Sequence, residues 1–252
     1  ALEKEFFNQK KEEAAIEAKN ERLRANLLRS ISHDLRTPLT SISGNASVLI
    51  NNSGSLDENK KMQLYEVIYD DSLWLINLVE NLLSVTRIED GKMNLHLETE
   101  LIEEVINEAL NHISHKKDEH RIEVKANDEF ILAKIDAGLI IQVIINIVDN
   151  AIKYTPKGSM ISIETFKHKD FVEIQIADDG AGISDKDKEK LFEMFYTVKH
   201  EVIDGRRGLG LGLALCKAII VAHGGNIAVK DNIPHGTIFS FTLPIKEVEI
   251  HE

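Results

Sequence analysis

The segment SHDLRTPLT, residues 32–40, brings together side chains that can act as a nucleophile and as a base. His33 and Asp34 are adjacent, and Pro38 follows in sequence that otherwise favours a helix. A proline lacks the N–H that would bond the Asp34 carbonyl, and inside a helix this defect typically costs about 3 kcal/mol. Two interpretations are open from this segment alone: a surface histidine in a bent helix, or a nucleophile that Asp34 orients or deprotonates.

A helical segment in the second half, IINIVDNAIKYT, carries two asparagines on one face. Asn146 and Asn150 are four residues apart, and Lys153 and Tyr154 follow them. Such a pattern is typical of an exposed polar stripe. It also suits an amide oxygen bound to Mg²⁺ with Lys153 near phosphate, because hard cations prefer oxygen ligands.

Two glycine-containing segments lie further along the chain. In ADDGAGI, residues 177–183, a strand ends in acids and then turns sharply, which is common, but Asp178 in this position could accept a hydrogen bond from an amine such as that of adenine. In GLGLGL the glycines expose backbone N–H groups at the start of an apolar helix, which suits phosphate. The three glycines there are Gly208, Gly210 and Gly212, and their spacing differs from the dinucleotide-binding fingerprint.

The composition narrows the class of protein. The chain has 252 residues, 43% of them hydrophobic, which is enough for one large domain or two modest ones. A net charge of -12 disfavours charge-driven binding to nucleic acid or to an anionic membrane. The single cysteine, Cys216, excludes an internal disulfide, fits a reducing compartment and is expected in the core. We find no apolar run near the roughly 20 residues of a membrane span and no signal peptide, and the charged start without methionine suggests an excised part of a longer protein.

The first part of the chain, residues 1–90, is predicted to form a helical hairpin. The segment INNSGSLDEN separates two helical stretches, and Ser55 or Asp57 is a candidate cap for the second. Each arm has an apolar stripe with spacings of three and four, which is the seam of a coiled coil or four-helix bundle. We therefore expect a homodimeric four-helix bundle. The stripe positions are Leu28, Ile31, Leu35, Leu39 and Ile42 in the first arm, and Leu64, Ile68, Asp71, Leu75, Leu78, Leu82 and Val85 in the second.

The position of His33 relative to this stripe follows from helical geometry. At about 100° per residue, His33 lies about 200° from both Ile31 and Leu35. The histidine is therefore expected on the exposed face of the first arm, opposite the stripe.

The second part, residues 91–252, has the pattern of an α/β layer with helices on one face of a mixed sheet. The pattern predicts strands at 93–97 and 121–125, a strand hairpin in SMISIETFKH and FVEIQIADD, and a terminal strand pair that ends at Leu243. It predicts helices at 101–112, 137–154 and 209–223, and a polar, mobile segment over 183–207.

Taken together and in order, these segments resemble the core of a bacterial sensor histidine kinase. SHDLRTPL is similar to the phospho-acceptor box, NIVDNAIKYT to the N box, DDGAGI to the first glycine box, LFEMFY to the F box and GLGLGL to the second glycine box. The segment LLRSISHDLRTPLTSISGNASVL further resembles the potassium-responsive sensor kinases called KdpD. The resemblance implies a dimeric hairpin followed by a two-layer ATP-binding domain of the Bergerat type, with a lid over ATP at about 183–208.

For phosphotransfer, the resemblance implies that His33 attacks the γ-phosphate of ATP, with Asp34 as general base or orienting group. The phosphate would then pass to an aspartate of a response regulator. Thr37 would align water if the protein also dephosphorylates that regulator. The resemblance also implies the cytoplasmic portion of a protein anchored in the bacterial membrane through segments outside this chain.

For ATP binding, the resemblance implies that Asn150 holds Mg²⁺, that Asn146 and Lys153 lie near the phosphates, and that Asp178 reads the adenine amine. The other implied positions are Tyr154 beside the adenine, Gly180 and Gly182 in its pocket, Phe192 and Phe195 as lid anchors, Gly208, Gly210 and Gly212 around the phosphates, and Ile183, Leu209, Leu211 and Thr237 without a more specific role.

Two departures from the family pattern and two rival functions accompany this reading. Thr197 stands where the family often has Arg, so a phosphate contact is either missing or supplied by Lys199, Arg206 or Arg207, and Pro234 stands where the closing segment often has Gly. An ATPase of the same fold without a phosphohistidine would leave SHDLRTPLT unexplained. A non-catalytic dimeric scaffold would leave Asn150, Asp178 and the glycines unexplained.

Overall fold

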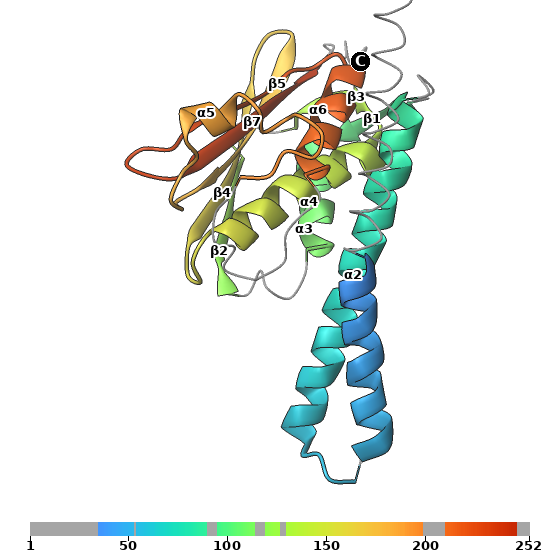
Figure 1. Ribbon diagram of the computed structural model, residues 1–252. Helices are drawn as coiled ribbons and strands as arrows, with labels where there is room; N and C mark the ends of the chain where they lie inside the picture. The colour runs from blue at the N-terminus through green and yellow to red at the C-terminus, as the bar shows by residue number, and fades with distance from the viewer. Residues whose placement is uncertain are drawn as a thin grey trace, which may run out of the picture. The chain divides into compact units, whose positions relative to one another are not determined.

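The computed structural model describes residues 35–52, 54–89, 95–113, 119–126, 130–198 and 210–245, and it divides the chain into two compact units, residues 1–77 and 78–252 (Figure 1). Each unit is described by itself. His33, Asp34, Gly208 and Leu209 lie outside the described residues, so their predicted positions stay predictions.

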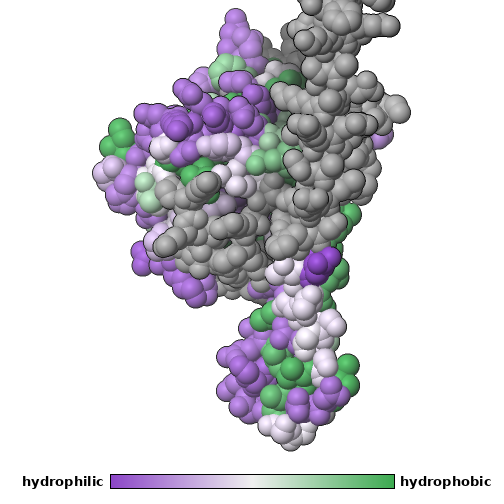
Figure 2. Space-filling view, viewed as in Figure 1, coloured by the Kyte–Doolittle hydropathy of each residue, from purple (hydrophilic) through white to green (hydrophobic). Residues whose placement is uncertain are grey.

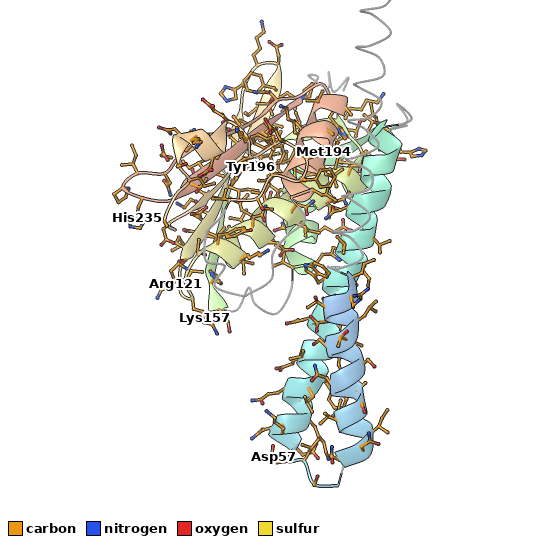
Figure 3. All side chains as sticks on the ribbon, viewed as in Figure 1. Asp57, Arg121, Lys157, Met194, Tyr196 and His235 are labelled. Carbon is orange, nitrogen blue, oxygen red and sulfur yellow. The ribbon has the colours of Figure 1, made fainter. Side chains whose placement is uncertain are left out.

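The first unit contains the predicted helical hairpin up to Asn77, and the rest of its second helix belongs to the second unit. One helix covers residues 35–52, and α2 (Glu58–Glu89) begins after a short turn. Asp57, labelled at this turn in Figure 3, caps α2: its Oδ1 accepts the Lys60 N–H at 2.7 Å. The Ser55 hydroxyl instead donates to the Asn52 carbonyl at 3.1 Å, so of the two predicted caps Asp57 is the one used.

The apolar stripe is largely confirmed on α2. Leu64, Ile68 and Leu75 are half-buried, and Asp71 is buried. On the first helix Leu39 is 53% exposed in the single chain while the neighbouring Pro38 is buried, and the burial of Leu39 in a dimeric bundle stays a prediction. Adjacent residues differ by about 100° around a helix, so turning Pro38 inward turns Leu39 outward.

The second unit is built on a five-stranded mixed sheet (Figure 1). Its strands lie in the order β2 (Arg121–Ala126), β4 (Met160–Lys167), β5 (Phe171–Asp178), β7 (Thr237–Pro244) and β6 (Ile227–Asp231). The β2–β4 pair is parallel and the other pairs are antiparallel. A separate antiparallel pair is formed by β1 (Glu98–Leu101) and β3 (Leu132–Ile135).

Three helices cover one face of this sheet in Figure 1, namely α3 (Ile102–Asn111), α4 (Ala137–Tyr154) and α6 (Gly212–Ala222). A single turn, α5 (Asp185–Lys188), follows β5. Strand residues alternate between the covered face and the other, which gives β4, β5 and β7 their every-second-residue burial. The core between the sheet and α4 includes Ile144, Ile147, Ile163, Ile174 and Phe241.

The structure confirms the predicted helices, the β4–β5 hairpin and the terminal strand pair, with three corrections. The strand predicted at 93–97 is wrong over its described part, because residues 95–97 are not in a strand and the His96 N–H bonds the Asp136 carboxylate at 3.1 Å. Strand β3 was not predicted. The helix predicted from residue 209 begins at Gly212, because Gly210 has a left-handed backbone with φ +67°.

Helix α4 also corrects the expectation about apolar runs. Its 18 residues have a mean hydropathy of 1.3, which by length and composition would be enough to cross a membrane. Seven of its side chains, from Ile140 to Ile152, are buried in the core. A buried core helix accounts for this composition.

Candidate nucleotide-binding site

Asp178 ends β5 at the edge of the candidate site, and its carboxylate is held by backbone donors. It is 8% exposed, and Oδ1 accepts the Gly180 N–H at 2.9 Å and the Thr237 N–H at 3.2 Å. Burial raises the pKa of this carboxyl above its ordinary value, and the hydrogen bonds from Gly180 and Thr237 partly oppose that rise. The structure therefore offers a fixed hydrogen-bond acceptor at the end of a central strand.

Gly180 and Gly182 lie so close to neighbouring atoms that a larger residue would not fit without a shift of those atoms. A Cβ at Gly180 would lie 2.8 Å from Cγ2 of Thr155 and 3.0 Å from Oδ1 of Asp178. Gly182 has φ +76°, and a Cβ there would lie 3.3 Å from the Gly236 carbonyl. Glycine at these positions lets the chain fold back tightly around the aspartate.

Helix α4 presents the predicted amides beside the start of α6. Asn146 and Asn150 are both half-buried, and a Cβ on Gly212 would lie 3.3 Å from Oδ1 of Asn146. Within this unit the amide of Asn146 also donates to Oδ1 of Asn81 at 3.4 Å. The asparagines are therefore not a plain solvent-exposed stripe, since both are half-buried and Asn146 lies against Gly212 at the start of α6.

Lys153 and Tyr154 lie at the other end of α4. The Lys153 ammonium lies 5.3 Å from the centroid of the Tyr154 ring, and Tyr154 is 43% exposed. Burial of part of the ring raises the pKa of the Tyr154 hydroxyl. This end of the helix combines a positive charge with an aromatic face.

The start of α6 has the geometry of an anion-binding helix terminus. Gly210 accepts the Phe195 N–H at 2.9 Å, and a Cβ at Gly210 would lie 2.5 Å from the Tyr196 carbonyl. Leu211, 2% exposed, precedes the first helical residue. The first N–H groups of a helix have no partner within it and carry a partial positive charge, which suits phosphate.

The segment between β5 and α6 is anchored to the domain over its described part, residues 183–198. Phe192 packs edge-on against Phe239 with ring centroids 6.5 Å apart, and Ile183 also packs against the core. The Tyr196 hydroxyl, labelled in Figure 3, donates to Asp187 at 2.5 Å, and this bond raises the pKa of the tyrosine. Phe195 is half-buried with φ 67°.

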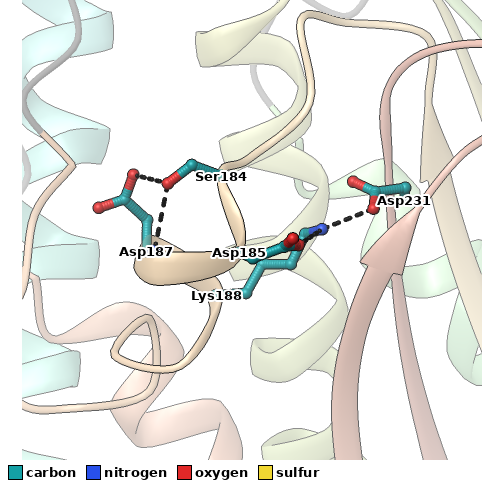
Figure 4. Close-up of polar contacts among 5 residues, drawn as sticks. All are labelled: Ser184, Asp185, Asp187, Lys188 and Asp231. Carbon is teal, nitrogen blue, oxygen red and sulfur yellow. Dashed lines mark hydrogen bonds and ion pairs between the residues drawn. The ribbon is translucent and has the colours of Figure 1, made fainter.

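Short polar contacts hold α5 in place, as Figure 4 shows. Ser184 caps the turn by accepting the Asp187 N–H at 3.3 Å. Lys188 reaches across to Asp231 at the end of β6 at 2.6 Å, and it also pairs with Asp185 at 2.8 Å. The two carboxylates raise the pKa of Lys188, so the start of the segment is tied to β6 by a charged lysine.

The predicted ATP-binding residues that the structure describes thus include two groups in the second unit. Asp178, Gly180, Gly182 and Thr237 meet at the end of β5, and Asn146 of α4 meets Gly212 at the start of α6. Thr37 lies in the first unit and is exposed on the helix over residues 35–52. Thr197, at one of the two departures, is also exposed. Sequence reasoning missed Asn232, whose side chain donates to the Asp178 carbonyl at 2.8 Å, and no local sequence pattern marks that contact.

The geometry agrees with the comparisons with known proteins. Residues 135–247 match the model of the histidine kinase-, DNA gyrase B- and HSP90-like ATPases, and residues 23–91 match that of the His Kinase A (phospho-acceptor) domain. The chain is 44% identical to the sensor protein KdpD of Clostridium acetobutylicum over 97% of its own length, but it spans only 27% of that relative.

Solved structures give the same result. The catalytic domain of histidine kinase ThkA is 30% identical, with a TM-score of 0.53, and the match covers 59% of this chain and 97% of that one. A structure of ThkA in complex with the response regulator protein TrrA matches with a TM-score of 0.60 and 26% identity, over 90% of this chain and 64% of that one.

The fold and the site together define an ATPase-type nucleotide-binding domain that follows a helical phospho-acceptor hairpin. The chain belongs to the histidine kinase family.

Proposed function

We propose that this chain is the catalytic core of a two-component sensor kinase, which phosphorylates its own His33 with ATP and passes the phosphate to an aspartate of a response regulator. The observation that carries the proposal is that one domain holds two suitable features. Asp178 at the end of β5 is a fixed hydrogen-bond acceptor for a base, and the start of α6, where Gly212 meets Asn146, is a helix terminus for phosphates.

At the base end, we assign the adenine amine to Asp178. The backbone N–H groups of Gly180 and Thr237 bond Oδ1, and the Thr237 side chain also bonds this carboxylate, so the acceptor is held in one orientation toward the amine. Tyr154 is assigned to the flank of the ring, where its 43% exposed side chain supports stacking. Gly180 and Gly182 admit the base because they add no side chain there.

At the phosphate end, we assign Gly210, Leu211 and Gly212 to the phosphates, together with Gly208 and Leu209 from the undescribed part of the chain. The N-terminus of α6 favours an anionic group there. Lys153, in the last turn of α4, is assigned to the phosphates for its positive charge. Asn146 lies next to Gly212 and is assigned to the same end of the nucleotide.

The residues at this end also fit a magnesium ion. Asn150 offers an amide oxygen one helical turn from Asn146, on a half-buried face, and oxygen donors are what Mg²⁺ prefers. When bound, the ion would neutralise charge on the triphosphate during transfer. Asn150 is accordingly proposed as the ligand from this chain.

The proposed chemistry at the hairpin has two balanced steps. A ring nitrogen of His33 attacks the γ-phosphorus, a P–N bond forms, the P–O bond to the β-phosphate breaks and ADP leaves, while Asp34 takes or orients the ring proton. An aspartate of the regulator then attacks the same phosphorus, and the P–N bond breaks. The comparison with ThkA supports such a partner, because that kinase was solved in complex with a response regulator protein.

We further propose that the chain forms homodimers through its hairpin. Large apolar side chains stay exposed on the single hairpin, among them Ile50 at 78%, Met62 at 59% and Ile76 at 52%. Figure 2 shows hydrophobic residues interspersed over its surface. Burying them against a second hairpin would complete the four-helix bundle. The similarity to KdpD supports a further proposal, that this core is the cytoplasmic portion of a membrane-anchored sensor.

The test is incubation of the purified chain with γ-labelled ATP and Mg²⁺. We expect an acid-labile, alkali-stable label that disappears in His33→Gln, and also in Asn150→Asp because Mg²⁺-ATP is lost. ATP hydrolysis without labelling of the wild-type chain would establish the ATPase alternative instead. Absence of nucleotide binding would establish the scaffold.

A further inference from the structure

We propose that Asn232 is a positioning residue for adenine recognition, acting through the backbone of Asp178. The inference rests on the proposed function, in which Asp178 reads the adenine amine. Asn232 lies in the turn between β6 and β7, outside the helices and glycine segments that are assigned to the nucleotide.

The turn over residues 232–236 is closed on itself and joined to the end of β5. The Asn232 N–H donates to the Gly236 carbonyl at 3.0 Å, which closes the turn. The Asn232 side-chain amide donates to the Asp178 carbonyl at 2.8 Å. Asn232 is half-buried, so this hydrogen bond is partly shielded from water.

The sheet ladder explains why a side chain is needed at this point. Antiparallel pairing between β5 and β7 runs from Phe171 opposite Pro244 to Ala177 opposite Ile238, and there it stops. The next residue of β5 is Asp178, which has no partner in the β7 register. Its carbonyl accepts a hydrogen bond from the Asn232 side-chain amide instead. Asn232 therefore continues the hydrogen bonding of β5 by one residue, to the residue that carries the carboxylate.

The same turn also delivers a donor to the carboxylate itself. Thr237 follows the turn directly, and its N–H bonds Oδ1 of Asp178 at 3.2 Å. Gly236 permits the approach, because it has φ +115° and a Cβ there would lie 1.9 Å from the Asp178 carbonyl oxygen. Both the main chain and the side chain of Asp178 are thus held by residues 232–237.

The orientation of Asp178 depends on these contacts. Its peptide group leads to Asp179 and then to Gly180, whose N–H bonds Oδ1. A rotation of the peptide after Asp178 would move the Gly180 donor away and let the carboxylate turn. Asn232 opposes that rotation, and a hydrogen bond to an amine is sensitive to the direction of its acceptor.

The test compares two nucleotides on the same variants: ATP, and the triphosphate of purine riboside, which lacks the 6-amino group. Asn232→Asp keeps the size of the side chain but replaces the amide donor with an oxygen that faces the Asp178 carbonyl. We expect this variant to bind ATP about tenfold more weakly, and the purine riboside analogue less than about twofold more weakly. In autophosphorylation, KM for ATP should rise while kcat stays near the wild-type value.

Ile233→Ala is the matched control. Ile233 lies in the same turn, and its side chain is 91% exposed. We expect this variant to change the affinities for both nucleotides equally, by no more than about twofold. His235, labelled in Figure 3, does not serve as the control, because its Nδ1 bonds the Asp179 carbonyl at 2.8 Å and so holds the peptide group that carries the Gly180 N–H.

The ratio of the two affinities separates the possible outcomes. Partial unfolding lowers both apparent affinities together and leaves their ratio unchanged. If Asn232→Asp folds too poorly to be measured, Asn232→Ala, which also removes the amide donor, provides the same comparison. Equal weakening of both nucleotides in both Asn232 variants would overturn the proposal, because the turn would then only support the fold. If the wild-type chain itself binds the two nucleotides equally, the assignment of Asp178 to the amine is wrong, and with it the proposed base recognition.

Discussion

The main-chain N–H of Asp136 donates to Nε2 of His223 at 3.0 Å, across 87 residues of sequence. The other ring nitrogen, Nδ1, lies 2.8 Å from the Ile219 carbonyl, so the ring is a neutral tautomer that donates at Nδ1 and accepts at Nε2. Asp136 in turn caps α4 by accepting the Leu139 N–H. The buried histidine at the end of α6 therefore fixes the start of the helix that carries Asn146 and Asn150.

Replacing His223 should destabilise the second unit. His223→Ala leaves the Asp136 N–H without its acceptor in a part-buried place, which typically costs about 1–3 kcal/mol. The free energy of unfolding from urea titrations measures this loss. His96→Ala is the control, because His96 bonds Asp136 through its backbone N–H, which the substitution keeps. An equal loss in both variants would contradict the role assigned to the His223 ring.

Gly210→Ala should impair nucleotide binding. The added Cβ would lie 2.5 Å from the Tyr196 carbonyl at a left-handed φ of +67°, so the segment that precedes α6 must shift. We expect ATP affinity to fall by at least about tenfold, measured by calorimetric titration.

Gly158→Ala provides the matched control for Gly210. Gly158 has φ +87°, but a Cβ there meets no atom within 4 Å. This variant carries the cost of a left-handed alanine without the collision, so it should lose some stability and keep its ATP affinity. Equal loss of affinity in both would mean that backbone strain, and not close packing against Tyr196, explains the Gly210 result.

Asp149→Asn should stabilise the protein at neutral pH. Burial raises the pKa of Asp149 to about 6, against a smaller opposing effect of Lys153. The folded state then binds the proton more tightly than the unfolded state, so the wild-type chain loses stability as the pH rises from about 4 to about 6, and the loss persists above that range.

The expected size follows from the pKa shift. A shift of about two units corresponds to about 3 kcal/mol, and because the side chain keeps some solvent exposure we expect about 1–2 kcal/mol at pH 8. Below about pH 3.5 the two proteins should unfold alike. Chemical unfolding at pH 3.5, 5 and 8 checks this, with the exposed Asp170→Asn as control. A difference between wild type and Asp149→Asn that does not vary with pH would rule out this explanation.

Pro38→Ala should change the balance between the proposed kinase activity and any dephosphorylation of the regulator by this chain. Pro38 lies buried in the helix over residues 35–52, next to exposed Thr37, and proline removes a backbone hydrogen bond of the helix. We expect the alanine variant to be more rigid near the phospho-acceptor and to shift the ratio of the two rates. Phosphotransfer and dephosphorylation assays with the same regulator measure that ratio, and an unchanged ratio would refute the idea.

The regular elements of this protein could be predicted from local patterns. The apolar period of 3.6 residues located α4, and the alternation in β4 and β5 located their hairpin. These signals work because each residue's burial follows from its own position along the element. Strand β3, which is only four residues long, carried too short a pattern to be recognised.

The candidate site was predictable only in its residue types. The chain order of Asn150, Asp178 and the glycines indicated a nucleotide site, because each type has a chemical preference that does not depend on its neighbours in space. Tertiary structure alone decided that Asn146 meets Gly212, that Asn232 holds the Asp178 carbonyl and that His223 holds Asp136. These contacts join segments 54 to 87 residues apart, and where such segments meet depends on the packing of the helices against the sheet, which no local pattern records.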